Sequence, residues 1–303
     1  MRIGLSGGGA TVDRMVDQAA RAEEDGFTGL WYAGAIGGDP LTAMAVAGRA
    51  TTTLELGTSV VQTYPCHPVL QAQRSAAVAN AIGRGFTLGI GPSHRPVIEN
   101  VYGMSYDHVG RHTEEYLTIL SGLLAGEGVD FKGEDFEVHL GAGMKPVAPV
   151  SILVAALAPR LIRVAGERTD GVILWMANAR AVETHVAPRL RQAASRAGRG
   201  DPRIVVGLPV AVHSDAAEAR QAAGEQFAGY GVLPNYRRIL DIGGVPGPAE
   251  AAIVGDEESV RGQIESLFSA GATDVWAAVF PVGANRAGSR DRSRVLLAEL
   301  ARS

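Results

Sequence analysis

The sequence contains little cysteine, no long apolar run and no excess of basic residues. Cys66 is the only cysteine among 303 residues, so an intrachain disulfide is excluded and a reducing cytoplasm is expected. No apolar run approaches the roughly 18 residues of a membrane helix, and the first residues lack the apolar core of a signal peptide. With 28 Lys and Arg against 32 Asp and Glu, the net charge of −4 provides no basic surface for nucleic acid or an anionic membrane.

The composition that remains is typical of a globular enzyme. Hydrophobic residues make up 46% of the chain and charged residues 20%, and no stretch is of low complexity. The length allows one large α/β domain or two ordinary ones. Because no linker interrupts the chain, a single domain over residues 1–303 is expected.

Short apolar segments alternate with helical segments along the chain. Thr11, Asp39-Pro40 and Asp256 are typical helix starts. The eight expected strands cover residues 2–6, 27–32, 54–61, 84–91, 150–155, 171–175, 203–212 and 273–280. Two segments break the alternation: residues 128–147, which have a short-hairpin pattern, and the irregular, Gly- and Pro-rich residues 231–254. Eight β/α units predict an α/β fold, a single (β/α)8 TIM barrel with insertions after strands four and seven.

The alternative architecture is a doubly wound open sheet. It is disfavoured, because no Gly-x-Gly-x-x-Gly follows the first strand and leads to an acidic ribose-binding residue. In a barrel the chemistry lies in the loops after the C-terminal ends of the strands. The candidate site residues are therefore those at the strand ends.

The first and third strands end in small residues. Ser6 and Gly7 begin a glycine-rich turn that either admits a ligand close to the backbone or is only a flexible turn. Thr58, Ser59 and Val60 lie where the third strand must bend, which permits an unusual backbone geometry under a flat ring. An ordinary β-bulge is the alternative at that position.

The fourth and fifth strands end in residues that suit a substrate and an anion. Gly91 is followed by Ser93 and His94, which are able to donate a proton or bind a carbonyl oxygen, unless the loop is merely solvated. After the fifth strand, Ala155, Ala156, Leu157 and Ala158 lead to a proline at a helix start, where free amides suit a phosphate. Arg160 either strengthens that site or faces water, and a plain tight turn is the alternative for the whole segment.

His108, His112 and Glu115 have a helical spacing that is able to hold a metal. The sequence between the two histidines lacks the glutamate of the zinc-protease pattern. A surface face on which Arg111 pairs with Glu115 is the favoured interpretation. No catalytic metal is therefore expected.

Several of these strand ends together resemble one family. The segments that carry the resemblance cover residues 56–60, 86–96, 154–159, 165–171, 233–238 and 253–256. With these segments the chain resembles the bacterial luciferase-like monooxygenase superfamily, in particular the branch that uses the deazaflavin coenzyme F420. The resemblance implies a non-prolyl cis peptide between Ser59 and Val60 that backs the deazaflavin ring. It also implies phosphate-tail contacts near residues 155–158.

The chain departs from some relatives at two strand ends. The sugar-phosphate dehydrogenases of this branch carry an Asp-His pair after strand two and a Glu after strand four. Here those positions read Ala33-Gly34-Ala35 and Gly91-Pro92-Ser93. The departures argue against the same acid-base residues and against a sugar-phosphate substrate.

The resemblance implies an oxidoreductase that moves a hydride between coenzyme F420 and a small organic substrate. His94 is the expected proton donor or orienting group, with Ser93 and Tyr64 as further catalytic candidates. The expected cofactor-binding residues are Ser6, Gly7, Thr58, Ser59, Val60, Gly91, Ala155, Ala156, Leu157, Ala158 and Arg160.

Two other functions stay open. The first is FMN-dependent monooxygenation, which requires a strong phosphate clamp for which Arg160 and Arg163 are the obvious candidates. The second is a barrel that binds deazaflavin without turnover, as a carrier or sensor. A small-molecule substrate, a homodimer and a cytoplasmic location are expected, and neither a nucleic acid nor a membrane partner is expected.

Overall fold

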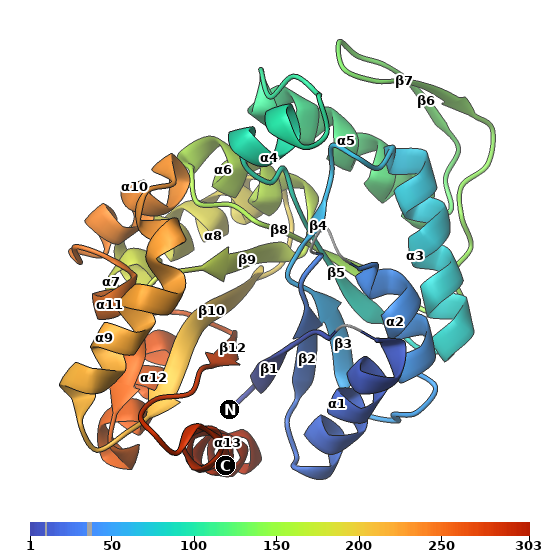
Figure 1. The fold of residues 1–303 in the computed structure, drawn as a ribbon. Coiled ribbons are helices and arrows are strands. Elements are labelled where there is room, and N and C mark those ends of the chain that lie inside the picture. The colour runs from blue at the N-terminus through green and yellow to red at the C-terminus, as the bar shows by residue number, and fades with distance from the viewer. Residues whose placement is uncertain (10, 35–37) are drawn as a thin grey trace.

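The computed structural model describes residues 1–9, 11–34 and 38–303, in which parallel strands form a closed barrel surrounded by helices (Figure 1). The barrel strands are β1 (Ile3–Gly7), β2 (Gly29–Tyr32), β3 (Glu55–Thr58) continued by β4 (Val61–Gln62), β5 (Phe86–Gly91), β8 (Val150–Val154), β9 (Gly171–Trp175), β10 (Arg203–Val212) and β12 (Asp274–Val279). β1 pairs in parallel with β2 on one side and with β12 on the other, which closes the sheet. The predicted (β/α)8 barrel is confirmed, and the open-sheet alternative is wrong.

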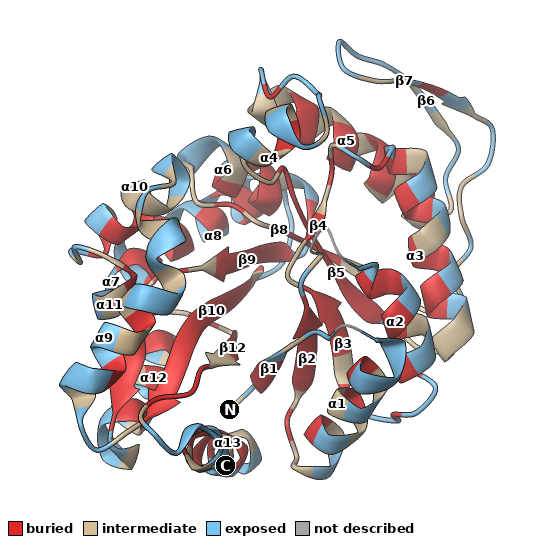
Figure 2. Ribbon diagram, in the orientation of Figure 1, coloured by how far each residue is buried: buried red, intermediate tan, exposed pale blue. Residues whose placement is uncertain are grey.

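Helices cover the outside of the barrel, with apolar faces inward and polar faces toward solvent (Figure 2). They are α1 (Val12–Glu24), α2 (Pro40–Ala47), α3 (Pro68–Ile82), α4 (Arg95–Asn100), α5 (Val109–Leu124), α6 (Pro159–Arg168), α7 (Ala179–Ala181) leading through a π-helical turn into α8 (Ala187–Arg196), α9 (Ala216–Phe227), α10 (Pro234–Ile242), α11 (Pro248–Ala251), α12 (Glu257–Ser269) and α13 (Arg286–Arg302). The predicted caps are confirmed, because Thr11, Asp39 and Asp256 each accept backbone amides of the helix that follows. Among the described helices, none has the length and apolar character that crossing a membrane requires.

Tryptophan rings fill the interior of the barrel. Trp31 on β2 and Trp276 on β12 belong to one buried cluster. Glycine lies opposite each ring: a Cβ at Gly57 would lie 2.4 Å from the Trp31 ring, and one at Gly207 would lie 1.9 Å from the Trp276 ring. Any larger residue at these two positions would displace a ring, so glycine is required for this interior.

The N-terminal end of the barrel is closed by ion pairs. The Arg203 guanidinium contacts Glu55 at 2.8 Å and Asp274 at 2.7 Å, and so joins three different strands. Burial of Asp274 raises the pKa of its carboxyl, but the guanidinium beside it outweighs this, and the net shift is downward. This end is therefore structural, and an accessible site belongs at the opposite end.

The third barrel strand is interrupted at the predicted place. The peptide between Ser59 and Val60 is cis, as the family resemblance implies. The segment predicted as one strand over 54–61 is two strands, because β3 pairs with β2 and β5 while β4 pairs with β5. The Ser59 amide donates to Tyr32 O at 2.8 Å, and Val60 O accepts the Gly34 amide at 3.1 Å.

Both predicted insertions are present, and one differs from its prediction. The first is an antiparallel hairpin of β6 (Val129–Lys132) and β7 (Glu137–Leu140), which projects from the barrel (Figure 1). The second, predicted to be irregular, contains α10, α11 and β11 (Ile253–Gly255), which pairs with β10 beyond the end of β9. The short helix α4 was not predicted, and Ala35 lies outside the described residues.

Candidate active site

A cavity of about 350 Å³ opens at the C-terminal end of the barrel. It is bounded by the ends of β5, β8 and β9 and by the first residues of α5, α6 and α10. Ten of the residues predicted to bind cofactor or substrate line it: Ser59, Val60, Gly91, Ser93, His94, Ala155, Ala156, Leu157, Ala158 and Arg160. The strand ends singled out in the sequence therefore converge on one space.

Three predicted cofactor-binding residues do not line this cavity. Ser6 and Gly7 end β1, which lies across the barrel from β8 in the order of the strands. Thr58 is fully buried, and its hydroxyl donates to Gly89 O at 2.7 Å. Thr58 thus joins two strands beneath the cavity. Because Ser6, Gly7 and Thr58 do not line the cavity, the predicted contact of these three residues with a ligand has no support from it.

Tyr64, a predicted catalytic candidate, also lies outside the cavity. Its ring stacks on His112 with 3.9 Å between ring centroids. The ring of Tyr106 lies next to it, at 5.3 Å between centroids, and Tyr106 is the residue that lines the cavity. Tyr64 therefore lies behind Tyr106, and its catalytic role stays a prediction.

The floor of the cavity contains the cis peptide. Val60 follows it, and Gly91 on β5 lies beside Val60. A Cβ at Gly91 would lie 2.8 Å from Ala155 Cβ and 3.1 Å from Val60 Cγ2, so glycine here keeps the cavity open. Ser59 Oγ is buried and has no hydrogen-bond partner among the described residues, which leaves it able to bind a ligand atom.

Helix N-termini without side-chain caps line the cavity. The first residues of α5, α6 and α10 lie against it, and none of the three helices has a side-chain cap hydrogen bond. By contrast, α1, α2, α9, α12 and α13, elsewhere on the barrel, are capped by Thr, Asp or Asn side chains. The uncapped amides and the positive dipole ends favour a negatively charged group in the cavity.

Arg160 lies at the rim where α5 and α6 meet. Its guanidinium packs against Gly110, where a Cβ would lie 2.6 Å from Nε. Its Nη2 is 3.4 Å from a carboxylate oxygen of Glu114, and the side chain is largely exposed. Arg163 pairs instead with Glu167 at 2.7 Å and does not line the cavity.

The loop before α6 is held from behind by His185. Its Nε2 lies 2.9 Å from the carbonyl oxygen of Leu157. Because a carbonyl oxygen only accepts, Nε2 carries the proton in this contact. This hydrogen bond fixes the path of the loop that was predicted to hold a phosphate.

His94 is a neutral imidazole in the cavity. Burial lowers its pKa below the ordinary value, so the uncharged form predominates at neutral pH. Its ring lies 5.4 Å from that of Tyr236, centroid to centroid. His94 is thus placed to donate or accept one hydrogen bond with a ligand oxygen.

Ser93 has the left-handed backbone conformation, with φ of 63°. Its hydroxyl accepts from Gln62 Nε2 at 3.2 Å, and its carbonyl oxygen accepts the Tyr106 hydroxyl at 2.6 Å. These contacts hold the residue in a conformation that costs free energy for a side chain with a Cβ. They also fix the neighbouring His94.

A sequence profile of the luciferase-like monooxygenase family matches residues 2–284, which is nearly the whole chain. The chain belongs to the luciferase-like monooxygenase family. The family resemblance and the expectation of an enzyme of the luciferase-like class are confirmed.

Two solved structures similar to this luciferase-like chain contain different cofactors. The 5,10-methylenetetrahydromethanopterin reductase of Methanolobus tindarius is 27% identical over 274 residues, covering 89% of this chain and 82% of the reductase. A solved F420-dependent secondary alcohol dehydrogenase, in complex with an F420-acetone adduct, has a TM-score of 0.75 at 19% identity and covers 97% of both chains. The oxygenating constituent of 3,6-diketocamphane monooxygenase from Pseudomonas putida, in complex with FMN, has a TM-score of 0.72 at 19% identity and covers 99% of this chain and 97% of its own. These two structures show the shared fold.

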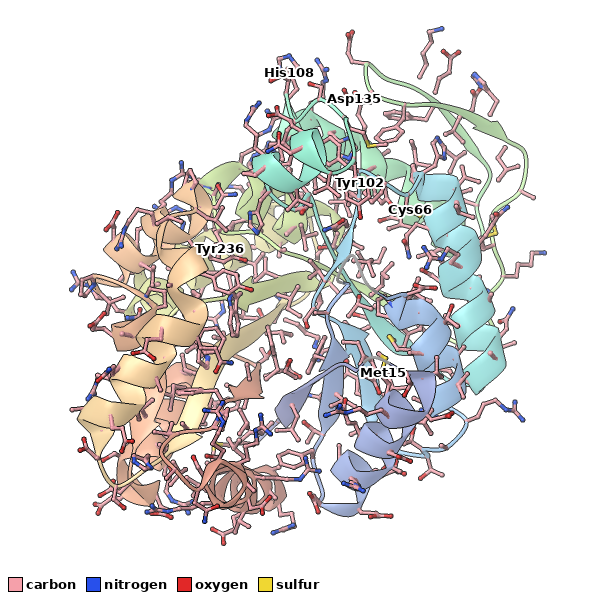
Figure 3. All side chains as sticks on the ribbon, in the orientation of Figure 1. Met15, Cys66, Tyr102, His108, Asp135 and Tyr236 are labelled. Carbon is pink, nitrogen blue, oxygen red and sulfur yellow. The ribbon has the colours of Figure 1, made fainter. Side chains whose placement is uncertain are left out.

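One side of the cavity is aromatic, which was not predicted from the sequence. Trp175, Trp276, Tyr106 and Tyr236 all line it. Trp175 is the last residue of β9, so the rule used for the earlier strand ends would have found it. Tyr236 lies on α10, on the side that faces the barrel (Figure 3), and no local pattern places that helix over the cavity.

No group of three or more potential metal ligands is found among the described residues. His112 is buried against Tyr64, so the prediction of a surface face is wrong at this position. Arg111 pairs with Asp135 at 2.8 Å and not with Glu115. Glu115 instead accepts the amides of residues 134–136 at 2.9 to 3.1 Å, because the hairpin turn folds onto α5.

Proposed function

We propose that the chain is an F420-dependent oxidoreductase that transfers a hydride between coenzyme F420 and a small organic substrate. The observation that carries the proposal is one cavity with two different ends. Its floor is the cis peptide between Ser59 and Val60, and its rim combines the uncapped N-termini of α5 and α6 with Arg160. A flat ring suits the first end and an anionic tail suits the second.

The residues present fit this cofactor. Gly91 leaves space beside Val60 where a Cβ would collide, and the buried Ser59 hydroxyl has no partner among the described residues. The loop over residues 155–158 supplies small side chains, so a phosphate is able to approach the backbone amides. His185 keeps that loop in place through Leu157.

The charge at the rim favours F420 over FMN. A phosphate monoester such as that of FMN carries nearly two negative charges at neutral pH. Arg160 is the only charged side chain among the described residues that line the cavity, and Glu114 offsets part of its charge. One partly offset cation is too little to balance a phosphate monoester such as that of FMN. A putative coenzyme F420-dependent oxidoreductase of Mycobacterium tuberculosis, 29% identical to this chain over 188 residues, supports the same choice.

When bound, F420 supplies or accepts a hydride at its deazaflavin ring. The protein's part is to hold the ring against the Ser59–Val60 peptide and to exclude water with the aromatic side chains of the cavity. His94 lies where it is able to donate a hydrogen bond to a substrate oxygen, and Ser93 fixes its position. His94 is neutral at pH 7, so it orients and polarises that oxygen.

The test is a titration of the purified protein with F420 and, separately, with FMN. We expect saturable F420 binding and much weaker FMN binding. Ala156→Phe should abolish F420 binding by filling the cavity, whereas Ala156→Ser at the same position should retain it. Binding of FMN alone would favour the second candidate, an FMN-dependent monooxygenase, and binding of neither cofactor would refute both functions. The homodimer and the cytoplasmic location remain predictions.

A further inference from the structure

The cavity has one wall made of aromatic rings that come from distant parts of the chain. Trp276 stacks on Trp175 with 5.0 Å between centroids and an interplanar angle of 20°. Tyr230 meets the Trp175 ring edge-on at 5.6 Å, and Tyr236 meets Tyr230 edge-on at 4.9 Å. The series ends at His94, 5.4 Å from Tyr236. Tyr230, in the turn after α9, and Tyr236, in the second insertion, thus complete a wall that begins inside the barrel.

This wall contains no charged side chain. Among the described lining residues, Arg160 alone is charged, and it lies on the rim with α5 and α6. His94 is neutral because burial lowers its pKa. A carboxylate or ammonium group against the wall would lose its hydration without gaining a charged partner, whereas a flat apolar molecule would gain ring contacts.

The Tyr236 hydroxyl is a donor without a partner in this wall. No hydrogen bond between described residues involves this hydroxyl, although the ring lies against Tyr230 and His94. Burial raises the pKa of this hydroxyl above its ordinary value, so it is protonated and able to donate at neutral pH. Figure 3 shows Tyr236 on the barrel side of α10. Tyr236 also lines the cavity.

We infer that the substrate is an uncharged molecule with a flat, apolar body and one carbonyl or hydroxyl oxygen, and that Tyr236 binds this oxygen together with His94. The inference rests on the proposed function, because it assumes that the cofactor takes the end of the cavity between the cis peptide and Arg160. Tyr236 is then the specificity-determining residue of the second insertion. A sugar phosphate or a free carboxylic acid is excluded by the same wall.

The test uses three matched probes: 2-acetonaphthone, which is neutral and has a carbonyl; 2-naphthoate, which has the same shape but is charged; and 2-ethylnaphthalene, which lacks the oxygen. Their dissociation constants are measured by calorimetry, with and without F420, for the wild type, Tyr236→Phe and the control Tyr102→Phe, which lies outside the cavity. We expect the ketone to bind at least about tenfold more tightly than the carboxylate. Tyr236→Phe should weaken the ketone about fivefold, the effect of one hydrogen bond, and leave 2-ethylnaphthalene unchanged.

Three results would overturn the inference: equal affinity for ketone and carboxylate, an unchanged ketone affinity in Tyr236→Phe, or binding of none of the probes. The F420 affinity of the same proteins is measured separately. F420 binding without ketone binding refutes this inference alone. Ketone binding without F420 binding refutes the proposed function alone.

Discussion

His112 should make the stability of the protein depend on pH in a way that one substitution removes. The imidazole is buried behind the cavity wall, stacked on Tyr64, with Nε2 3.2 Å from Thr63 Oγ1. Burial lowers its pKa from 6.5 to about 4, against the smaller opposing effects of Asp135 and Glu115. As the pH falls, His112 in the unfolded chain therefore takes up a proton at a higher pH than it does in the folded protein.

The sign and size of the effect follow from these two values. The contribution of neutral His112 to the free energy of unfolding is fully present above about pH 7. It is lost as the pH falls from 6.5 toward about 4. The difference between the two pKa values is equivalent to about 3 kcal/mol in total, of which about 2 kcal/mol is lost by pH 5. His112→Phe keeps a ring against Tyr64 but leaves the Thr63 hydroxyl without its partner, which costs about 1 kcal/mol at pH 8.

The stability curves of wild type and His112→Phe should therefore cross near about pH 6. Urea unfolding between pH 8 and 5 measures both curves. His139→Phe on the exposed hairpin is the control of opposite sign: Glu137 and Asp130 raise the pKa of His139, so this variant should fall below the wild type as the pH drops. The window stays above the range in which Glu23, whose pKa backbone amides lower to about 2, loses its stabilising charge. Parallel curves for wild type and His112→Phe would refute the reasoning.

Three further predictions concern the rim, the loop and the hairpin. Arg160→Gln should weaken F420 binding about threefold to tenfold at about 0.05 M NaCl and less at about 0.5 M NaCl, as measured by fluorescence titration. Arg163→Gln, on the same helix but outside the cavity, should leave F420 binding nearly unchanged. Equal effects of the two variants would contradict the anion site. Ser93→Val should lower the free energy of unfolding by about 1–3 kcal/mol, because a β-branched residue is strained at φ 63°, whereas Ser93→Gly should change it by less than about 1 kcal/mol. Glu115→Ala should speed proteolysis within residues 133–136, because it removes three amide contacts, and an unchanged cleavage rate would contradict that role.

The barrel was predictable because its signals are local. Helix caps such as Thr11 and Asp39 and apolar strand segments each occupy a few consecutive residues, and eight repeats leave few alternative folds. The helices α4 and α10 were missed. Each has a proline in its first turn and lies in a segment rich in turn residues, so the local sequence favours a loop.

The side of the cavity that is proposed to hold the cofactor was predictable, and the aromatic side was not. Ser59, Gly91 and Ala155 lie at strand ends, where the barrel geometry alone brings them together. Tyr236 reaches the cavity only because the second insertion folds back over it, which is a tertiary effect. Tyr64 shows the converse: it follows a strand end, but its ring stacks on His112 and does not line the cavity.

The most direct test of the central claim is a crystal structure of the protein soaked with F420. The proposal requires the deazaflavin ring to lie against the cis peptide between Ser59 and Val60, with the phosphate beside Arg160 and the N-terminus of α6. F420 bound anywhere else, or a cavity that stays empty of F420 at saturating concentration, would contradict the claim.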